Sequence, residues 1–184
     1  MAGNRSQFGP NVMTVQEATN QIAQRRVIRV SPGFQAAATD QHDVAFNGNE
    51  IPNAVLRPGG TSRLTLLQVI NYSDTACSFD IIFTQQKATL GTVGAAVSIT
   101  DANLKIAKVL ATVSLVTGEA QVDGINWLAE LAVMGGASTQ DNLANGIILQ
   151  AEEDSTSVYF AGIDRTGADV DDLEFIFHIE YWFN

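Results

Sequence analysis

The last segment of the chain, residues 172–183 (DLEFIFHIEYWF), alternates between wholly apolar and mixed positions. One set of alternate positions holds Leu173, Phe175, Phe177, Ile179, Tyr181 and Phe183. The other set holds Glu174, Ile176, His178, Glu180 and Trp182. Successive side chains of a strand point to opposite faces of its sheet. The pattern is typical of a half-buried antiparallel strand, and we predict that this segment is a structural member of a sheet.

Two pairs of β-rich segments are separated by short turn-like sequences. Residues 62–73 and 76–84 flank SDT, and residues 156–164 and 172–183 flank RTGADVD. Short turns between such segments favour antiparallel hairpins, so we predict a hairpin for each pair. One face of the segment 76–84 carries Cys77, Phe79, Ile81 and Phe83. In the segment 62–73, strict alternation places Leu64, Leu66 and Gln68 on one face and Arg63, Thr65, Leu67 and Val69 on the other.

Further short strands are predicted at residues 26–31, 42–47, 109–116, 126–134 and 146–152. The segment 98–110 (SITDANLKIAKVL) predicts one short helix, near residues 100–108. Thr100 is its expected N-cap, Asp101 lies near the positive end of the helix dipole, and Lys105 and Lys108 lie towards the negative end. Many short strands separated by turns indicate an all-β fold. We predict an antiparallel β-sandwich, with a jelly roll as its most favoured version.

The first 25 residues differ from the rest of the chain. They are polar and rich in small residues, without sustained alternation. We predict an extended N-terminal arm at residues 1–25 and a single β-sandwich domain at residues 26–184; a disordered tail is the alternative for the arm. An arm of about 25 residues could reach tens of ångströms beyond its own domain.

Composition indicates a globular protein: 46% of the residues are hydrophobic and 16% are charged. The single cysteine, Cys77, excludes an intrachain disulfide. The chain begins without the apolar segment of a secretory signal, and no apolar run approaches the roughly 18–20 residues of a membrane span. We therefore expect a soluble protein made in a reducing cytoplasm.

The net charge of −10 is unevenly distributed. Residues 109–184 carry thirteen acidic groups and one basic group, a net of −12, whereas residues 1–63 carry six basic and four acidic groups, a net of +2. An acidic body repels phosphate backbones, so we expect no general nucleic-acid binding. Arg25, Arg26 and Arg29 could bind an acidic partner, or they could flank the first strand in solvent.

The mixed face of the last strand is unusual, because Ile176, His178 and Trp182 share it with two glutamates. We expect a second sheet, a loop or another subunit to cover this face. Since a monomer of this size would leave part of such a face wet, we also expect self-association.

Signals of catalysis and of bound cofactors are weak. With His42 and His178 as the only histidines and Cys77 as the only cysteine, we expect no zinc site. We interpret His178 as a structural histidine beside Glu174 or Glu180. Neither a P-loop nor a G-x-S-x-G nucleophile motif occurs. We predict that the protein is not an enzyme and needs no cofactor.

Carboxylates also gather in two predicted turns, Glu152–Asp154 and Asp169–Asp172. We interpret both as solvent-facing turns. Calcium binding is the alternative for these turns, although neither matches an EF-hand loop.

Three stretches of the chain resemble small virion structural proteins of tailed bacteriophages. These are LRPGGTSRLTLLQVINYSDTACSFDIIFT, LGTVGAAVSITDANLKIAKVL and STSVYFAGIDRTGADVDDLEFIFHIEYWF, which together span residues 56–184. In such proteins a strand ending in xNxSDxA pairs with one of the type xFDIxFT, and the chain closes on a β-strand. The resemblance implies a capsid decoration (cement) protein: a β-sandwich with an extending arm that trimerises on the capsid surface. Its partner would be the major capsid protein, and its location the virion, after assembly in the host cytoplasm.

Two other functions stay open at this point. One is a tail or head-fibre attachment component, and the other is a carbohydrate-binding β-sandwich. The aromatic residues that could form a sugar-binding platform are Tyr72, Trp127, Tyr159, Tyr181 and Trp182. For a decoration protein, we expect Arg25, Arg26 and Arg29 to anchor the arm on carboxylates of the shell. The mixed face of the last strand, with Ile176, His178 and Trp182, would add contact area.

Overall fold

The computed structural model describes residues 25–33, 40–72, 77–116, 120–122, 126–132, 146–167 and 173–181. Its elements in chain order are β1 (Arg25–Val30), β2 (Val44–Ile51), β3 (Thr61–Asn71), β4 (Ser78–Thr84), α2 (Asp101–Ala107), β5 (Val109–Val116), β6 (Ala120–Val122), β7 (Asn126–Ala132), β8 (Ile147–Gln150), β9 (Val158–Asp164) and β10 (Leu173–Tyr181). The predicted arm lies outside the described residues, except that Arg25 opens β1.

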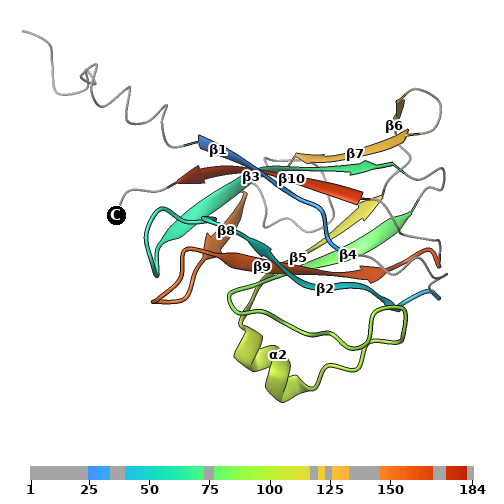
Figure 1. The fold of residues 1–184 in the computed structure, drawn as a ribbon, viewed down its shortest axis with the longest axis horizontal. Helices are drawn as coiled ribbons and strands as arrows, with labels where there is room; N and C mark the ends of the chain where they lie inside the picture. The colour runs from blue at the N-terminus through green and yellow to red at the C-terminus, as the bar shows by residue number, and fades with distance from the viewer. Residues whose placement is uncertain are drawn as a thin grey trace, which may run out of the picture.

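These strands form two antiparallel sheets that face each other across one core (Figure 1). The six-stranded sheet has the order β1-β10-β3-β7-β6, with β8 also paired to β3, and the four-stranded sheet has the order β2-β9-β4-β5. The predicted antiparallel β-sandwich is therefore confirmed. The last strand, β10, lies between β1 and β3, so it is an interior strand of the larger sheet.

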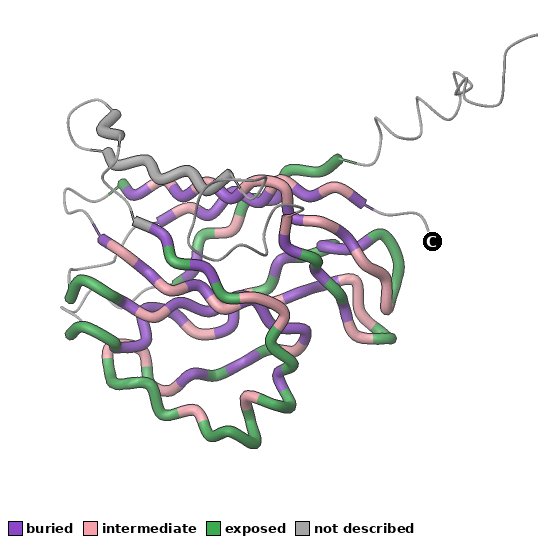
Figure 2. Tube along the Cα trace, turned by 180° about the vertical axis from the view of Figure 1, so that it is seen from behind, coloured by how far each residue is buried: buried purple, intermediate pink, exposed green. Residues whose placement is uncertain are grey.

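Both predicted hairpins are wrong. β3 belongs to the six-stranded sheet and β4 to the four-stranded sheet, and β9 and β10 are divided in the same way. In each pair the short connection crosses from one sheet to the other. Each strand still buries its apolar face, because the two sheets point their inner faces into the same core, as the alternation of buried and exposed positions illustrates (Figure 2).

The faces of β3 also differ from strict alternation. Ser62 and Leu64 are buried, and so are Leu67 and Val69. The pairing with β10 shifts between His178 and Ile179, which face Leu66 and Leu64, so Thr65 is an extra residue in β3. Such a β-bulge reverses the parity of the positions that follow it. Thr65 Oγ1 donates a hydrogen bond to the His178 carbonyl at 2.9 Å, which ties the bulge to β10.

The predicted helix is confirmed as α2, with Thr100 as its N-cap. Thr100 Oγ1 accepts a hydrogen bond from the Asn103 amide at 3.3 Å. The helix ends at Lys108, which has left-handed backbone angles (φ 53°, ψ 80°) and whose amide donates to the Lys105 carbonyl. A left-handed residue at a helix end satisfies carbonyls of the last turn, so both ends of α2 are capped.

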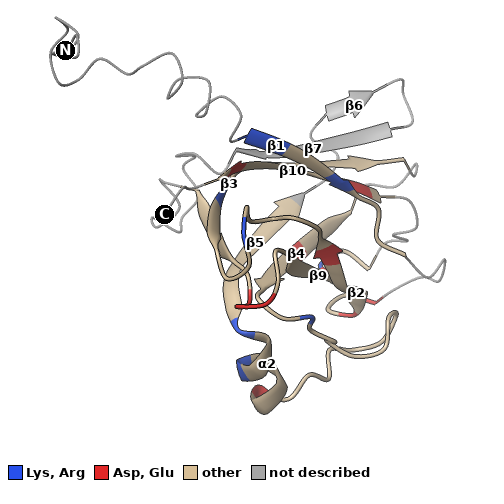
Figure 3. Ribbon diagram, turned by 60° about the vertical axis from the view of Figure 1, so that its left-hand side comes forward, with Lys and Arg blue, Asp and Glu red and all other residues tan. Residues whose placement is uncertain are grey.

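The segment that leads into α2 covers the outer face of the four-stranded sheet, away from β10 (Figure 3). Leu90 from this segment is fully buried against Val44 and Ala161, with Val93 and Ile99 packed around them. Its backbone also bridges β2, where the Val44 amide donates to the Ala95 carbonyl at 2.9 Å. This layer was not predicted, because the apolar and polar residues of the segment do not repeat with the period of a strand or a helix.

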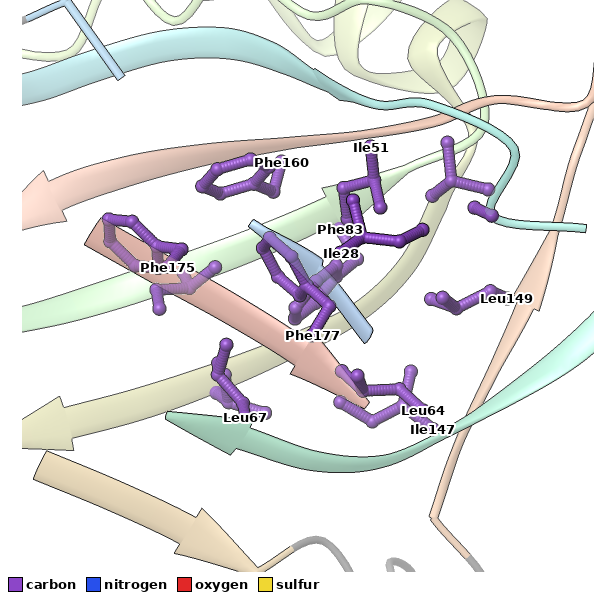
Figure 4. Packing of buried hydrophobic residues seen from close by; sticks show 14 of the residues in the cluster. Ile28, Ile51, Leu64, Leu67, Phe83, Ile147, Leu149, Phe160, Phe175 and Phe177 are labelled. Carbon is purple, nitrogen blue, oxygen red and sulfur yellow. The ribbon is translucent and has the colours of Figure 1, made fainter. Parts of the chain in front are cut away.

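The main core lies between the sheets and is rich in phenylalanine (Figure 4). Phe177 of β10 packs against Phe160 of β9, with ring centroids 4.9 Å apart, and against Phe83 of β4 at 6.2 Å. Phe46 of β2 contacts Phe175 of β10 at 5.2 Å. Burying each of these side chains contributes about 1.5–3 kcal/mol. The predicted apolar face of β10 is confirmed from Leu173 to Tyr181.

Candidate interaction surface

The outer face of the six-stranded sheet brings together most of the residues predicted to make contacts. In the pairing of β1 with β10, Arg25 lies opposite Glu180, Val27 opposite His178 and Arg29 opposite Ile176. β3 completes the face on the other side of β10, where Gln68 lies opposite Ile176. We call this surface the β1/β10 face; it comprises Arg25, Val27, Arg29, Arg63, Gln68, Tyr72, Glu174, Ile176, His178 and Glu180. Trp182, also predicted to make contacts, lies outside the described residues.

Arg29 has a partner within its own chain. Its Nη1 lies 2.9 Å from Glu174 Oε2, and the Tyr72 hydroxyl donates to the same oxygen at 3.1 Å. The Arg29 side chain is 59% exposed, whereas that of Glu174 is 18% exposed. An exposed ion pair contributes little to stability, about 0–1 kcal/mol. The pair does fix the guanidinium over the sheet, which leaves Arg29 less available to an outside carboxylate than the sequence suggested.

A second ion pair lies further along the same face. Arg63 Nη2 of β3 lies 2.5 Å from Glu180 Oε2 of β10. The Arg63 Nε atom is buried and has no hydrogen-bond partner among the residues that the structure describes. Arg63 and Gln68 were not predicted as site residues, because their contacts with Glu180 and His178 depend on the register of β3 against β10.

His178 lies between these two ion pairs. Its Nε2 is 3.0 Å from Gln68 Oε1, which is a carbonyl oxygen and accepts, so Nε2 carries the proton. The histidine was expected to lie beside Glu174 or Glu180. It lies between them along β10, but its hydrogen bond goes to the neutral amide across the strand pair.

Ile176 is only 4% exposed, so it is covered within its own chain. This residue was one of the reasons to expect a covering subunit, and the structure removes that reason. Val27, which is 53% exposed, is the apolar residue of the β1/β10 face that solvent reaches most.

Arg25 and Arg26 are the cations of this region that stay unpaired. Both side chains are exposed, and neither forms an ion pair with any residue that the structure describes. They lie at the start of β1, which is an edge strand of its sheet. Their position suits contact with an acidic partner next to the point where residues 1–24 join the sandwich.

The other candidates from the sequence lie elsewhere. His42 is exposed in the turn before β2, and its amide donates to the Asp164 carbonyl at 2.8 Å. The turn containing Glu153 and Asp154 is confirmed, whereas residues 169–172 lie outside the described residues. Among the residues that the structure describes, no group of three His, Cys, Asp or Glu side chains could hold a metal ion. Within the same residues, no helix is long and apolar enough to cross a membrane.

The tyrosines considered for sugar binding have different environments. Tyr181 is buried, and its hydroxyl donates to the Asn53 carbonyl at 2.7 Å, so it offers no platform. Tyr72 is 44% exposed beside Glu174. Burial, with a smaller contribution from the charge of Glu50, raises the pKa of Tyr159 above its ordinary value of 10.0. Tyr159 of β9 is thus partly buried and Tyr181 of β10 is buried, one in each sheet.

No known family model matches the chain, and no curated protein is significantly similar to it.

Proposed function

We propose that the chain is a structural protein of a bacteriophage particle, which decorates the capsid and stabilises it by bridging neighbouring shell subunits. Its partners would be the major capsid protein and further copies of itself, as a trimer. The protein would act at the capsid surface through contact area rather than through chemistry. The resemblance of residues 56–184 to virion structural proteins motivates this proposal.

One observation carries the proposal furthest: the place where the arm joins the sandwich. β1 follows the arm directly and pairs with the last strand at the edge of the six-stranded sheet. Residues 1–24 therefore leave the domain beside the unpaired Arg25 and Arg26 and beside the β1/β10 face. An arm and a rigid face that begin at the same edge can contact two neighbouring shell subunits at once.

We further propose that the sandwich is a jelly roll. β10 pairs with one edge of β3. On the other edge of β3, β7 pairs with residues 66–71 and β8 pairs with residues 61–64. Counted as one position, and with the three-residue β6 set aside as an addition at the edge beyond β7, they complete the order β1-β10-β3-β7/β8 facing β2-β9-β4-β5. Eight strand positions in two sheets of four, with most connections crossing between the sheets, support this type of sandwich.

Modest contacts would suffice for this function. Many copies on one particle act together, and detaching one does not detach the rest. Arg25 and Arg26 would meet carboxylates of the shell, while most of the acidic body would face outward. Because Arg29 is paired with Glu174, we assign it a supporting role in holding the face together.

Co-sedimentation with heads of the virus that encodes the chain tests the proposal. The full chain should bind heads, and deletion of residues 1–24 should weaken binding strongly. Arg25→Glu with Arg26→Glu should also weaken it, whereas the control Arg57→Glu, an exposed arginine in the turn after β2, should not. Heads that lack the protein should rupture at lower temperature. Binding to tails alone would favour the attachment-component reading, and equal binding by the truncated chain would overturn the proposal.

A further inference from the structure

The end of the molecule opposite the β1/β10 face carries an exposed apolar and basic surface. Helix α2 and the start of β5 form a shallow pocket of about 330 Å³, lined by Asp101, Leu104, Lys105, Lys108 and Val109. Beside it, Ile106 is 61% exposed, more than any other large apolar side chain that the structure describes, and Val109 is 44% exposed. We call Leu104, Lys105, Ile106, Lys108 and Val109 the α2 patch.

The core does not account for α2. The helix has seven residues, of which only Ala107 is buried. Isolated helices shorter than about 12–15 residues are marginal in water, and most helices in proteins are stabilised by a buried apolar face. α2 instead keeps Ile106 in solvent and is held by its caps and by the Gln85 and Gln86 amides, which donate to the Lys108 and Ala107 carbonyls at 3.0 and 3.1 Å. The side chains that α2 exposes to solvent therefore need an explanation other than the packing of the core.

Lys108 is a second, independent sign that residues of α2 are not explained by folding alone. Its backbone has φ 53°, in the left-handed region, which costs an L-residue about 1–2 kcal/mol and which glycine normally occupies after a helix. A glycine would close the helix equally well. The lysine side chain forms an ion pair with Glu152 at 2.8 Å, but a solvent-exposed pair of this kind adds little to stability. Folding alone thus does not favour lysine here.

The charges around the patch form two complementary halves. The pocket lining holds Lys105 and Lys108 beside Asp101, and Lys108 is paired with Glu152. Lys105, which forms no ion pair with any residue that the structure describes, supplies the positive charge available to a partner on a protein whose net charge is −10. The ion pair between Lys108 and Glu152 brings the turn Glu152–Asp154 next to the patch. Glu153 and Asp154 in this turn are exposed and form no ion pair with any residue that the structure describes. A basic, apolar half and an acidic half thus lie side by side on each copy.

We propose that the α2 patch binds a second copy of this chain, with Lys105 facing Glu153 and Asp154 of that copy and Ile106 buried between them. Charge complementarity selects this occupant, since every copy carries both halves of the contact. Contacts of this kind close into small rings when the rotation between copies allows it. The proposal rests on the self-association within the proposed function and names the surface that would make it, a surface that needs neither the arm nor a shell.

Sedimentation equilibrium of the full chain over a range of concentrations tests the proposal. The wild type should associate in low salt and dissociate at about 1 M salt, where the Debye length falls to about 3 Å. Ile106→Asp and Lys105→Glu should each raise the dissociation constant about tenfold or more. The matched control is Leu56→Asp, since Leu56 is also an exposed aliphatic residue, at 52%, and has a basic neighbour in the sequence, Arg57, as Ile106 has Lys105; it should associate like the wild type.

A charge reversal gives the sharpest test. The single reversal Lys105→Glu should abolish most association, and combining it with Glu153→Lys and Asp154→Lys should restore it. Lys108→Gly should keep or raise the unfolding temperature while weakening association. A wild type that stays monomeric throughout, or variants that associate like it, would overturn the proposal. The proposal would also be overturned if the protein were a monomer and Ile106→Asp abolished its binding to heads, because the patch would then contact the shell.

Discussion

Phe177 shows how much a single side chain contributes to this core. It is fully buried and contacts aromatic rings from both strands that face it, Phe160 at 4.9 Å and Phe83 at 6.2 Å. We expect Phe177→Ala to lower the free energy of unfolding by roughly 3–5 kcal/mol, as measured by chemical denaturation. Phe177→Asp should prevent folding, because it would bury an unpaired charge. Leu56→Ala, on the surface, should change the free energy by less than about 0.5 kcal/mol.

Glu152 is the residue whose protonation reports on the α2 patch. Its hydrogen bond from Lys108 lowers the pKa of its carboxyl below the ordinary value of 4.5, against a smaller opposing effect of desolvation. Because the folded-state pKa is depressed, the pair stabilises the fold above pH 4.5 and loses that effect as the pH falls through the lowered pKa. NMR titration of the carboxyl carbon in the dilute protein should give a midpoint below 4.5.

The Lys108→Gly variant is the control for this titration. Without the ammonium group, the midpoint of Glu152 should move up towards 4.5. An unchanged midpoint would mean that the ion pair does not form in solution.

At the scale of single elements, α2 depends on its N-cap. Thr100 Oγ1 accepts from the Asn103 amide, and the Thr100 carbonyl accepts from the Leu104 amide at 2.9 Å. Thr100→Ala should cost the helix about 1 kcal/mol. Hydrogen exchange of the Leu104 amide should accelerate by about fivefold, in line with that energy, while amides of β10 should be unaffected. Thr100→Ser retains the hydroxyl and should exchange like the wild type.

Strand pairing is the part of the fold that the sequence patterns predicted least well. Residues 72–77 connect β3 to β4 and residues 165–172 connect β9 to β10, and both connections join strands of different sheets. Alternation shows which face of a strand is apolar. It does not show whether the next strand pairs with it in the same sheet or lies in the opposite sheet, because the apolar face is buried in both arrangements. The bulge at Thr65 is a similar case, because a hydroxyl bonded to the His178 carbonyl leaves no signature in the pattern.

At the scale of the whole molecule, the described core begins at β1. Ile28, 6% exposed, is the first residue in the chain that belongs to it. Deletion of residues 1–24 should therefore leave the thermal unfolding midpoint within a few degrees of the wild type, measured by circular dichroism. Deletion of residues 1–30 removes Ile28 and uncovers the edge of β10, so it should lower the midpoint strongly. Equal losses in the two deletions would show that the arm is part of the fold.

Local patterns in the sequence were sufficient to predict the fold class, most of the strands, the buried face of β10 and α2 with its N-cap. They were sufficient because alternation and capping involve residues close together in the chain. β6, with three residues, was too short to leave a pattern.

The partners of the site residues depended on contacts between distant segments. Arg29 meets Glu174 and His178 meets Gln68 only because β10 lies between β1 and β3 in one particular register. Ile176 was expected to be covered by a second sheet, a loop or another subunit, and the structure buries it within its own chain. The pairing of strands far apart in the chain is chosen by how all the apolar faces pack into one shared core, and a local pattern contains no information about that choice.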